Sequence, residues 1–351
     1  MDISRRGVLQ TVAGGAALIG TGRARAQGQE AVPAALQPIY EAAKKEGQLT
    51  WYSGYLDQTI CARIGNAFSQ KWPGITVNAT KTTSQVAFQR LLQDMKGGQI
   101  QSDVFSSTDA SHMEYLQKKG LLIHFDPPNA KGMIPALRDF DPKGDYYPGW
   151  VGVAAIAYNT SKVSAADSPK DWPDLADPKW KDKVTFGSPI YSGMVGNWTV
   201  AMEQKFGWEY FKKLNALNPL IGRSIDDAIT VLNSGERVVG LVSVASVLRN
   251  AAKGNPLAVN YPTSGTLVVP SPTAIIKGCP SPNAGKLFLD FTCGPEYSQI
   301  LAAEFEQPLR GDVKVPKGAQ SLADVTVLTP TIAQLEKVLP PNKDKWKETF
   351  S

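Results

Sequence analysis

Small and hydroxyl-bearing side chains stand immediately before predicted helices at three places in this sequence. Hydroxyl groups, together with the unpaired backbone N–H groups at a helix start, favour an anion without requiring a fixed positive charge. Glycine at such a place lets the backbone approach a ligand closely. The residues of this kind are Ser53, Gly54, Tyr55, Ser106, Ser107, Thr108, Tyr191, Ser192 and Gly193. They predict non-covalent binding of a small anion, and ordinary turns or helix caps are the alternative explanation.

Further residues are also candidates for contact with a ligand. Arg223 stands just before a possible capping box at Ser224, and its guanidinium group suits bidentate contact with a phosphonate, phosphate or carboxylate. Ser243, at the end of a predicted strand, and Tyr261 offer hydroxyl groups. The alternatives are a surface arginine and hydroxyls that satisfy the neighbouring backbone. Trp198 either lies in the core or walls the site, where it would favour an amine-bearing or aromatic ligand.

Motifs for catalysis and for metal binding are absent from the sequence. It contains no Gly-x-Ser-x-Gly, Gly-x-x-x-x-Gly-Lys-Ser/Thr or His-Glu-x-x-His motif, and no cysteine is paired by motif with a histidine. His112 and His124 are not spaced as a metal pair. We therefore predict no catalytic residue, no metal and no cofactor. Asp226 and Asp227 resemble a carboxylate dyad, which leaves an extracytoplasmic enzyme as an alternative, although helix capping explains Asp227 more simply.

Alternating strands and helices must position these residues. The predicted strands lie at residues 49–53, 75–79, 104–105, 151–158, 184–186, 238–244 and 273–277. The predicted helices follow Asp57 and lie at 84–95, 193–206, 224–233 and 282–292. Such alternation is typical of an α/β fold with a mainly parallel sheet. Ligands of these folds bind beyond the carboxyl ends of the strands, where the hydroxyl-rich segments begin.

The first residues predict an export signal. Arg5 and Arg6 precede an apolar stretch at 8–20, and Ala24-Arg25-Ala26 matches a signal peptidase site, so we expect cleavage near Ala26. The paired arginines resemble a twin-arginine signal, and an ordinary Sec signal is the alternative. A retained membrane anchor is less consistent with an apolar stretch well short of the ~20 residues of a membrane span. Either export route predicts a periplasmic protein.

Composition and charge indicate a soluble two-lobed protein. The remaining ~325 residues exceed one ordinary core and suit two lobes. The whole chain has a formal charge of +5, and without residues 1–26 it has 33 basic and 31 acidic side chains. This near balance gives no support to nucleic-acid binding.

Three cysteines form an odd set for an oxidising compartment. A helix at 282–292 would hold Cys279 and Cys293 roughly 20 Å apart, whereas a disulfide needs Cα atoms within about 7 Å. We expect no bridge between this pair, and a partner for Cys61 stays open.

Six segments resemble the periplasmic solute-binding proteins of ABC transporters, in the class that includes iron(III), thiamine, hexose-phosphate and phosphonate binders. They are Tyr158–Lys162, Asp171–Leu175, Asp177–Trp180, Gly187–Gly193, Val268–Pro272 and Pro282–Gln299. The resemblance implies a type II periplasmic-binding-protein fold, with parallel-rich mixed sheets, two hinge strands and an interlobe cleft. Lobe one would contain residues 27–150 and 265–351, and lobe two residues 151–264. It also implies a monomer that delivers a small molecule to a permease in the inner membrane.

The resemblance also bears on the ligand. Iron(III) binders of this class typically use adjacent tyrosines with a histidine and a glutamate, which suit a highly charged ion. The corresponding loops here read 53–57 (SGYLD) and 106–109 (SSTD), and the one adjacent pair, Tyr146-Tyr147, precedes the first hinge. We therefore expect a small organic anion, namely a phosphonate, phosphate ester or carboxylate. An iron site that uses Tyr191 with carbonate or citrate is the alternative.

Overall fold

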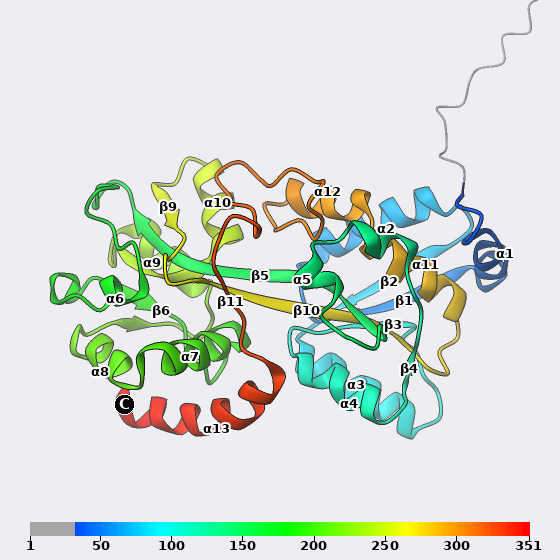
Figure 1. The fold of residues 1–351 in the computed structure, drawn as a ribbon, viewed down its shortest axis with the longest axis horizontal. Helices are drawn as coiled ribbons and strands as arrows, with labels where there is room; N and C mark the ends of the chain where they lie inside the picture. Colours follow the sequence, from blue (N-terminus) through cyan, green and yellow to red (C-terminus); the bar gives the residue numbers. More distant parts are fainter. Residues whose placement is uncertain (1–31) are drawn as a thin grey trace, which may run out of the picture.

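A computed structural model describes residues 32–351, so the predicted export signal and its cleavage site lie outside the described part of the chain. Two α/β lobes lie side by side, and the long strands β5 (Tyr146–Asn159) and β10 (Thr266–Ile276) run through both (Figure 1). Both strands are buried along almost their whole length, as their uncharged sequences predict. The two-lobed fold with two hinge strands is thus confirmed.

Lobe one contains the first strands and helices of the chain. Its strands are β1 (Gln48–Ser53), β2 (Thr76–Lys81), β3 (Val104–Ser106) and β4 (Leu122–Ile123). Its helices are α1 (Gln37–Glu46), α2 (Gln58–Lys71), α3 (Ser84–Lys96), α4 (Ala110–Lys118), α5 (Pro135–Arg138), α11 (Pro282–Thr292) and α12 (Pro295–Ala303), with a 3-10 turn at Pro128–Gly132. β1 pairs in parallel with β2 and β3, as strand–helix alternation predicts.

Lobe two repeats this alternation. Its strands are β6 (Val184–Phe186), β7 (Leu220–Ile221), β8 (Val239–Ser243) and β9 (Leu257–Asn260). Its helices are α6 (Trp172–Leu175), α7 (Gly193–Phe206), α8 (Glu209–Ala216), α9 (Asp227–Ser234) and α10 (Val244–Ala252), with a 3-10 turn at Pro178–Trp180. The predicted helix at 193–206 is confirmed. The reciprocal bonds of the predicted capping box are present: Ser224 Oγ accepts from the backbone N–H of Asp227 at 3.2 Å, and Asp227 Oδ2 accepts from the backbone N–H of Ser224 at 3.0 Å. The regular helix nevertheless begins only at Asp227.

One mixed sheet connects the lobes. Its strands lie in the order β2-β1-β3-β10-β5-β8-β6-β7, so that β10 borders lobe one and β5 borders lobe two. β5 and β10 are antiparallel, and their register shifts between Ser271 and Pro272. Proline cannot donate to a strand ladder, and Pro148, Pro270 and Pro272 all lie in this stretch. The pairing of the two shared strands is therefore locally interrupted between the lobes.

A partly buried ion pair also connects the lobes. Arg249 Nη1 on α10 donates to Glu306 Oε1 beyond α12 at 2.7 Å, and Trp150 Nε1 on β5 donates to Glu306 Oε2 at 2.9 Å. Burial raises the pKa of Glu306, while Arg249 acts in the opposite direction. The carboxylate is thus held by one donor from lobe two and one from a hinge strand.

The C-terminal helix departs from the expected lobe division. β11 (Val327–Leu328) leads into α13 (Ile332–Thr349), which packs mainly along α7 of lobe two and also contacts α8 of that lobe and α4 of lobe one (Figure 1). Trp346 supplies the reason, because its ring packs against Phe186 and Phe211 in the core of lobe two. Pro340 and Pro341 lie inside this helix.

The three cysteines lie apart in the fold. α11 spans Pro282–Thr292 as predicted and separates Cys279 from Cys293. Each of these two thiols, and that of Cys61, is free and buried. Within residues 32–351, no helix is both long and apolar enough to cross a membrane.

Candidate functional site

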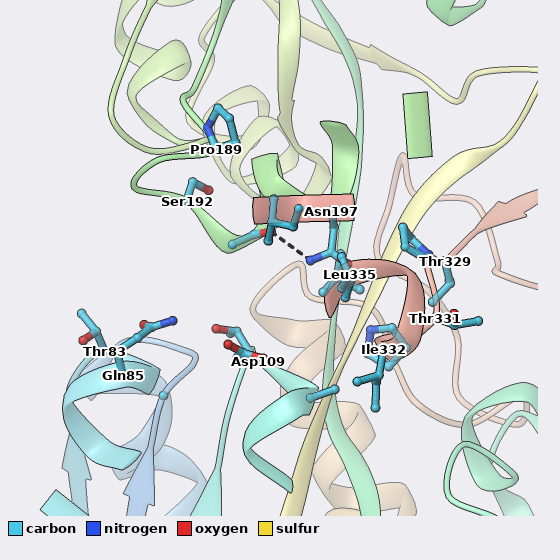
Figure 2. A pocket seen from close by; sticks show the side chains of 18 of the residues that line it. Thr83, Gln85, Asp109, Pro189, Ser192, Asn197, Thr329, Thr331, Ile332 and Leu335 are labelled. Carbon is cyan, nitrogen blue, oxygen red and sulfur yellow. Dashed lines mark hydrogen bonds between the residues drawn. The ribbon is translucent and has the colours of Figure 1, made fainter. Parts of the chain in front are cut away.

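A cavity of about 1070 Å³ lies between the two lobes. Its walls come from the starts of α3 and α4 in lobe one, the start of α7 in lobe two, β10 and one side of α13 (Figure 2). The N-termini of α3, α4, α7 and α13 therefore border one cavity. The partial positive charge of each N-terminus favours a negatively charged ligand.

The lobe-one wall is a network of capping residues. Thr83 Oγ1 accepts from the backbone N–H of Val86 at the start of α3, and Asp109 caps α4. Ser84 Oγ lies 2.8 Å from Thr108 Oγ1 and accepts from the Thr108 backbone N–H at 2.9 Å. The starts of α3 and α4 are thus tied together.

The lobe-two wall is the turn before α7. Ser192 Oγ accepts from the backbone N–H of Val195 at 3.4 Å, and Asn197 Nδ2 donates to the carbonyl oxygen of Gly193 at 2.9 Å. Tyr191 is 65% exposed at the cavity, and the guanidinium of Arg223 lies 4.9 Å from its ring centroid. Small polar groups and one exposed aromatic ring thus border the cavity on this side.

Two lysines line the cavity without a carboxylate partner. Lys81 Nζ donates to the carbonyl oxygen of Thr82 at 2.9 Å but forms no ion pair within residues 32–351. Its pKa is lowered by burial, because a half-buried ammonium group loses hydration, although the nearby Cys61 and Asp57 act in the opposite direction. Lys343 on α13 likewise has no acidic partner in the described chain. Of the acidic lining residues, Asp139 is paired with Arg138, and Asp109 accepts hydrogen bonds from Ser111.

The candidate ligand-binding residues fall into three groups. Those that line the cavity are Gly54, Thr108, Tyr191, Ser192 and Gly193. Those that are buried behind its lobe-one wall are Ser53, Tyr55, Ser106 and Ser107. The third group does not line the cavity and consists of Arg223, Ser243 and Tyr261. Arg223 lies near the cavity because its guanidinium group is over the ring of Tyr191, which is a lining residue. Tyr261 Oη instead accepts from the backbone N–H of Gln320 at 3.0 Å.

The buried hydroxyls support the wall from behind. Ser53 Oγ donates to the carbonyl oxygen of Tyr55 at 2.6 Å, and Tyr55 Oη lies 2.7 Å from Thr273 Oγ1. Ser106 Oγ accepts from Trp51 Nε1 at 2.8 Å. Trp198 is fully buried beside Trp172, Phe186 and Phe211, so the suggestion that it walls the site is wrong.

Several lining residues escaped the sequence analysis. They are Lys81, Thr83, Gln85, Asn197, Thr331 and Lys343. Thr83 was detectable, because it stands immediately before the predicted helix at 84–95 as a typical N-cap. Lys343 was not, because only the packing of α13 brings the end of the chain to the cavity.

His112 connects two residues behind the lobe-one wall. Its Nδ1 lies 2.9 Å from Ser107 Oγ, and its Nε2 lies 3.7 Å from Asp109 Oδ2. The ring stacks on Phe88 with 4.0 Å between centroids. Burial lowers the pKa of His112 below its ordinary value of 6.5, although Asp109 acts in the opposite direction. The neutral imidazole is thus the form that the fold favours.

We expect this histidine to make stability depend on pH. A lowered folded-state pKa contributes stability above pH 6.5, and that stability is lost as the pH falls through the lowered value. Urea unfolding of the native protein and of His112→Asn should therefore diverge on going from pH 7.5 to about pH 5, with the native protein losing more stability. Parallel losses in the two proteins would contradict this role.

Comparison with known proteins identifies the family. The sequence profile described as bacterial extracellular solute-binding protein matches residues 101–337. A candidate 2-aminoethylphosphonate-binding periplasmic protein of Salmonella typhimurium is 24% identical over 282 residues, covering 76% of this chain and 77% of that protein. A candidate ABC transporter periplasmic-binding protein of Sinorhizobium fredii is 23% identical over 263 residues, covering 70% of this chain and 71% of that protein.

Solved structures share the fold. The periplasmic binding protein AfuA of Actinobacillus pleuropneumoniae, with bound fructose-6-phosphate, has a TM-score of 0.72 and 21% identity and covers 87% of this chain and 98% of its own. Iron-bound HitA of Pseudomonas aeruginosa has a TM-score of 0.72 and 22% identity, and the match covers 86% of this chain and 99% of HitA.

These relatives are transport binding proteins rather than enzymes, and their periplasmic location supports the location predicted for this chain. The family profile spans well over half of the chain, and the two-lobed fold agrees with it. This protein therefore belongs to the bacterial extracellular solute-binding proteins, and its function is to bind a solute.

Proposed function

We propose that this protein captures a small organic anion, namely a phosphonate, phosphate ester or carboxylate, in the interlobe cavity and delivers it to an ABC-transporter permease in the inner membrane. The observation that carries the proposal is Lys81, a half-buried cation that forms no ion pair within residues 32–351, at a cavity that four helix N-termini also border. An anion placed there would supply the direct acidic partner that Lys81 lacks, since Asp57 acts on its charge without forming an ion pair.

The donors come from both lobes, which connects binding to closure. Lys81 and the start of α3 belong to lobe one, while Ser192 and the start of α7 belong to lobe two. An anion that accepts hydrogen bonds from both walls stabilises the arrangement in which the walls are near each other. A liganded, closed form would then be the one presented to the permease.

The names of the relatives are consistent with an anion. The Salmonella relative is described by a phosphonate ligand, and AfuA was solved with a sugar phosphate. HitA was solved with iron, and a ferric ion requires several anionic ligands. In this cavity the two carboxylates, Asp109 and Asp139, already have partners, whereas Lys81 and Lys343 form no ion pair in the described part of the chain. Within residues 32–351 no three His, Cys, Asp or Glu side chains are grouped to hold a metal ion.

A thermal-shift screen tests the proposal directly. A ligand at 100 times its dissociation constant stabilises the folded state by about 2.7 kcal/mol. We expect stabilisation by at least one member of a panel of alkyl and aryl phosphonates, sugar phosphates and carboxylates. Stabilisation by ferric citrate alone would refute the anion and favour iron.

Replacement of Lys81 by methionine should weaken binding of the anion found in that screen by roughly 10- to 100-fold, as expected when a charge-assisted contact worth about 1.5–3 kcal/mol is lost. Isothermal titration calorimetry would measure the change. Lys119→Met is the matched control, because Lys119 is exposed at the far end of α4. Equal affinities in both variants would exclude Lys81 from the site.

Export and oligomeric state complete the proposal. We infer cleavage near Ala26 after export by the twin-arginine route, and a monomeric mature protein. N-terminal sequencing of the periplasmic protein should begin at Gln27. Substitution of Arg5 and Arg6 by lysine should block export if the twin-arginine route is used, and should leave it intact if the Sec route is used.

A further inference from the structure

The C-terminal helix presents an apolar stripe to the interlobe cavity. Ile332, Leu335, Leu339 and Lys343 follow one another at spacings of three, four and four residues, and all four line the cavity. Residues at such spacings share one face of a helix. Figure 2 shows Ile332 and Leu335 on α13 across the cavity from Thr83 and Gln85. The stripe formed by Ile332, Leu335 and Leu339 is therefore apolar. Thr331 and Lys343, which also line the cavity, place a hydroxyl group and an ammonium group at its two ends.

Other apolar surface continues this wall. Val269 and Pro270 of β10 also line the cavity, as do Pro189 and Ile190, which precede Ser192. Apolar surface exposed to water costs about 25 cal/mol per Å² relative to burial. A ligand that covers this wall would recover that cost, whereas a fully polar ligand would not.

Contacts with lobe two hold α13 in place. Trp346 is buried in the core of that lobe. Leu339 fills the space beside Gly196 on α7, where an added Cβ would come within 3.1 Å of Leu339 Cδ1. Thr331 and Gln334 form a reciprocal capping box at the start of α13. Rotation of α13 to hide the stripe would break these contacts.

An exposed aromatic ring lies at the same cavity. Tyr191 is among the few large apolar side chains of residues 32–351 that are mostly exposed, and Arg223 lies over its ring. A flat apolar group in the cavity would find in Tyr191 a partner for ring stacking.

We propose that the ligand is an organic acid whose phosphonate, phosphate or carboxylate head is joined to a compact apolar group, either aryl or branched alkyl. The head binds at Lys81 and the starts of α3 and α7, and the apolar group lies on Leu335 and Leu339. This assignment rests on the proposed function and narrows it, because it separates the ligand from aminoalkyl phosphonates and sugar phosphates. The cavity volume, about 1070 Å³, leaves room for both parts.

Calorimetric titration of the mature protein with phenylphosphonate, methylphosphonate and 2-aminoethylphosphonate tests this inference. The three share one head group and differ only in what is attached to it. We expect phenylphosphonate to bind at least about tenfold more tightly than the other two, because only the phenyl group covers the apolar wall. If the polar or methyl compound binds as tightly, the inference is wrong and the anion proposal stands. If none of the three binds while ferric citrate does, the anion proposal itself fails.

A variant pair locates the apolar group. Leu335→Asn keeps a side chain of similar size on a half-buried position but removes the hydrocarbon surface. We expect its affinity for phenylphosphonate to fall by about tenfold and its affinity for methylphosphonate to stay within twofold of the native value. Val338→Asn, on the same helix but outside the cavity lining, should change neither. Native affinity of Leu335→Asn for phenylphosphonate would overturn the role of α13.

Discussion

Replacement of Trp346 by alanine should lower the free energy of unfolding by about 3–5 kcal/mol, the range for truncation of a buried aromatic side chain. Trp346 is 3% exposed, and its ring centroid lies 5.7 Å from that of Phe186 and 5.8 Å from that of Phe211. A residue near the C-terminus is thus a central part of the core of lobe two. Urea denaturation followed by circular dichroism would measure the loss.

The same variant should also lose ligand affinity, because Trp346 holds α13 and with it the cavity-lining Leu335 and Lys343. Lys347→Ala is the matched control, since Lys347 is the exposed next residue of the helix. It should unfold within about 0.5 kcal/mol of the native protein. A Trp346→Ala protein of native stability would show that the packing of α13 contributes little to the fold.

Replacement of Gly54 by alanine should destabilise the protein by about 1–3 kcal/mol, as expected for an added atom in a packed site. A Cβ there would lie 2.3 Å from Ser84 Oγ and 2.9 Å from both Ser84 Cα and the carbonyl oxygen of Ser106. Relief of the clash must move the start of α3 away from β3. Since Thr83 and Gln85 belong to that start, we also expect anion affinity to fall by tenfold or more, which corresponds to about 1.4 kcal/mol or more.

Gly311→Ala provides the comparison for this substitution. A Cβ at Gly311 would have no atom within 4 Å. This substitution therefore reduces backbone freedom as Gly54→Ala does, but it causes no steric clash. We expect native affinity and a change in stability within about 0.5 kcal/mol. If Gly54→Ala behaves like this control in both unfolding and titration, the start of α3 does not depend on the close approach at Gly54.

Much of the fold could be predicted because strand and helix patterns are local. The apolar run after Val151 indicated a strand buried on both faces, and β5 is that strand. The C-terminal helix was harder to assign, because Pro340 and Pro341 interrupt the helical pattern and proline is costly inside a helix. Its place on lobe two depends on Trp346, whose partners are more than a hundred residues away in the sequence.

The site was only partly predictable for a related reason. The sequence indicated where strands end, and Ser192 and Thr108 at such ends do line the cavity. Side chains alternate between faces in a strand, however, so Ser53 and Ser106 at the last positions of β1 and β3 turn into the core. Lys81 is the last residue of β2, and its place beside the cavity depends on the parallel pairing of β2 with β1. The sequence does not reveal which strands pair, so this position could not be inferred from it.

The shared strands also determine which parts of the molecule would travel farthest during closure. If one lobe rotates relative to the other about the stretch of β5 and β10 between them, each atom is displaced in proportion to its distance from that stretch. The cavity walls beside β10 would shift little, while α1 at one extremity and α6 at the other would shift most (Figure 1). A membrane partner that contacts both extremities would therefore distinguish the liganded from the unliganded protein by the distance between α1 and α6, without contact with the ligand.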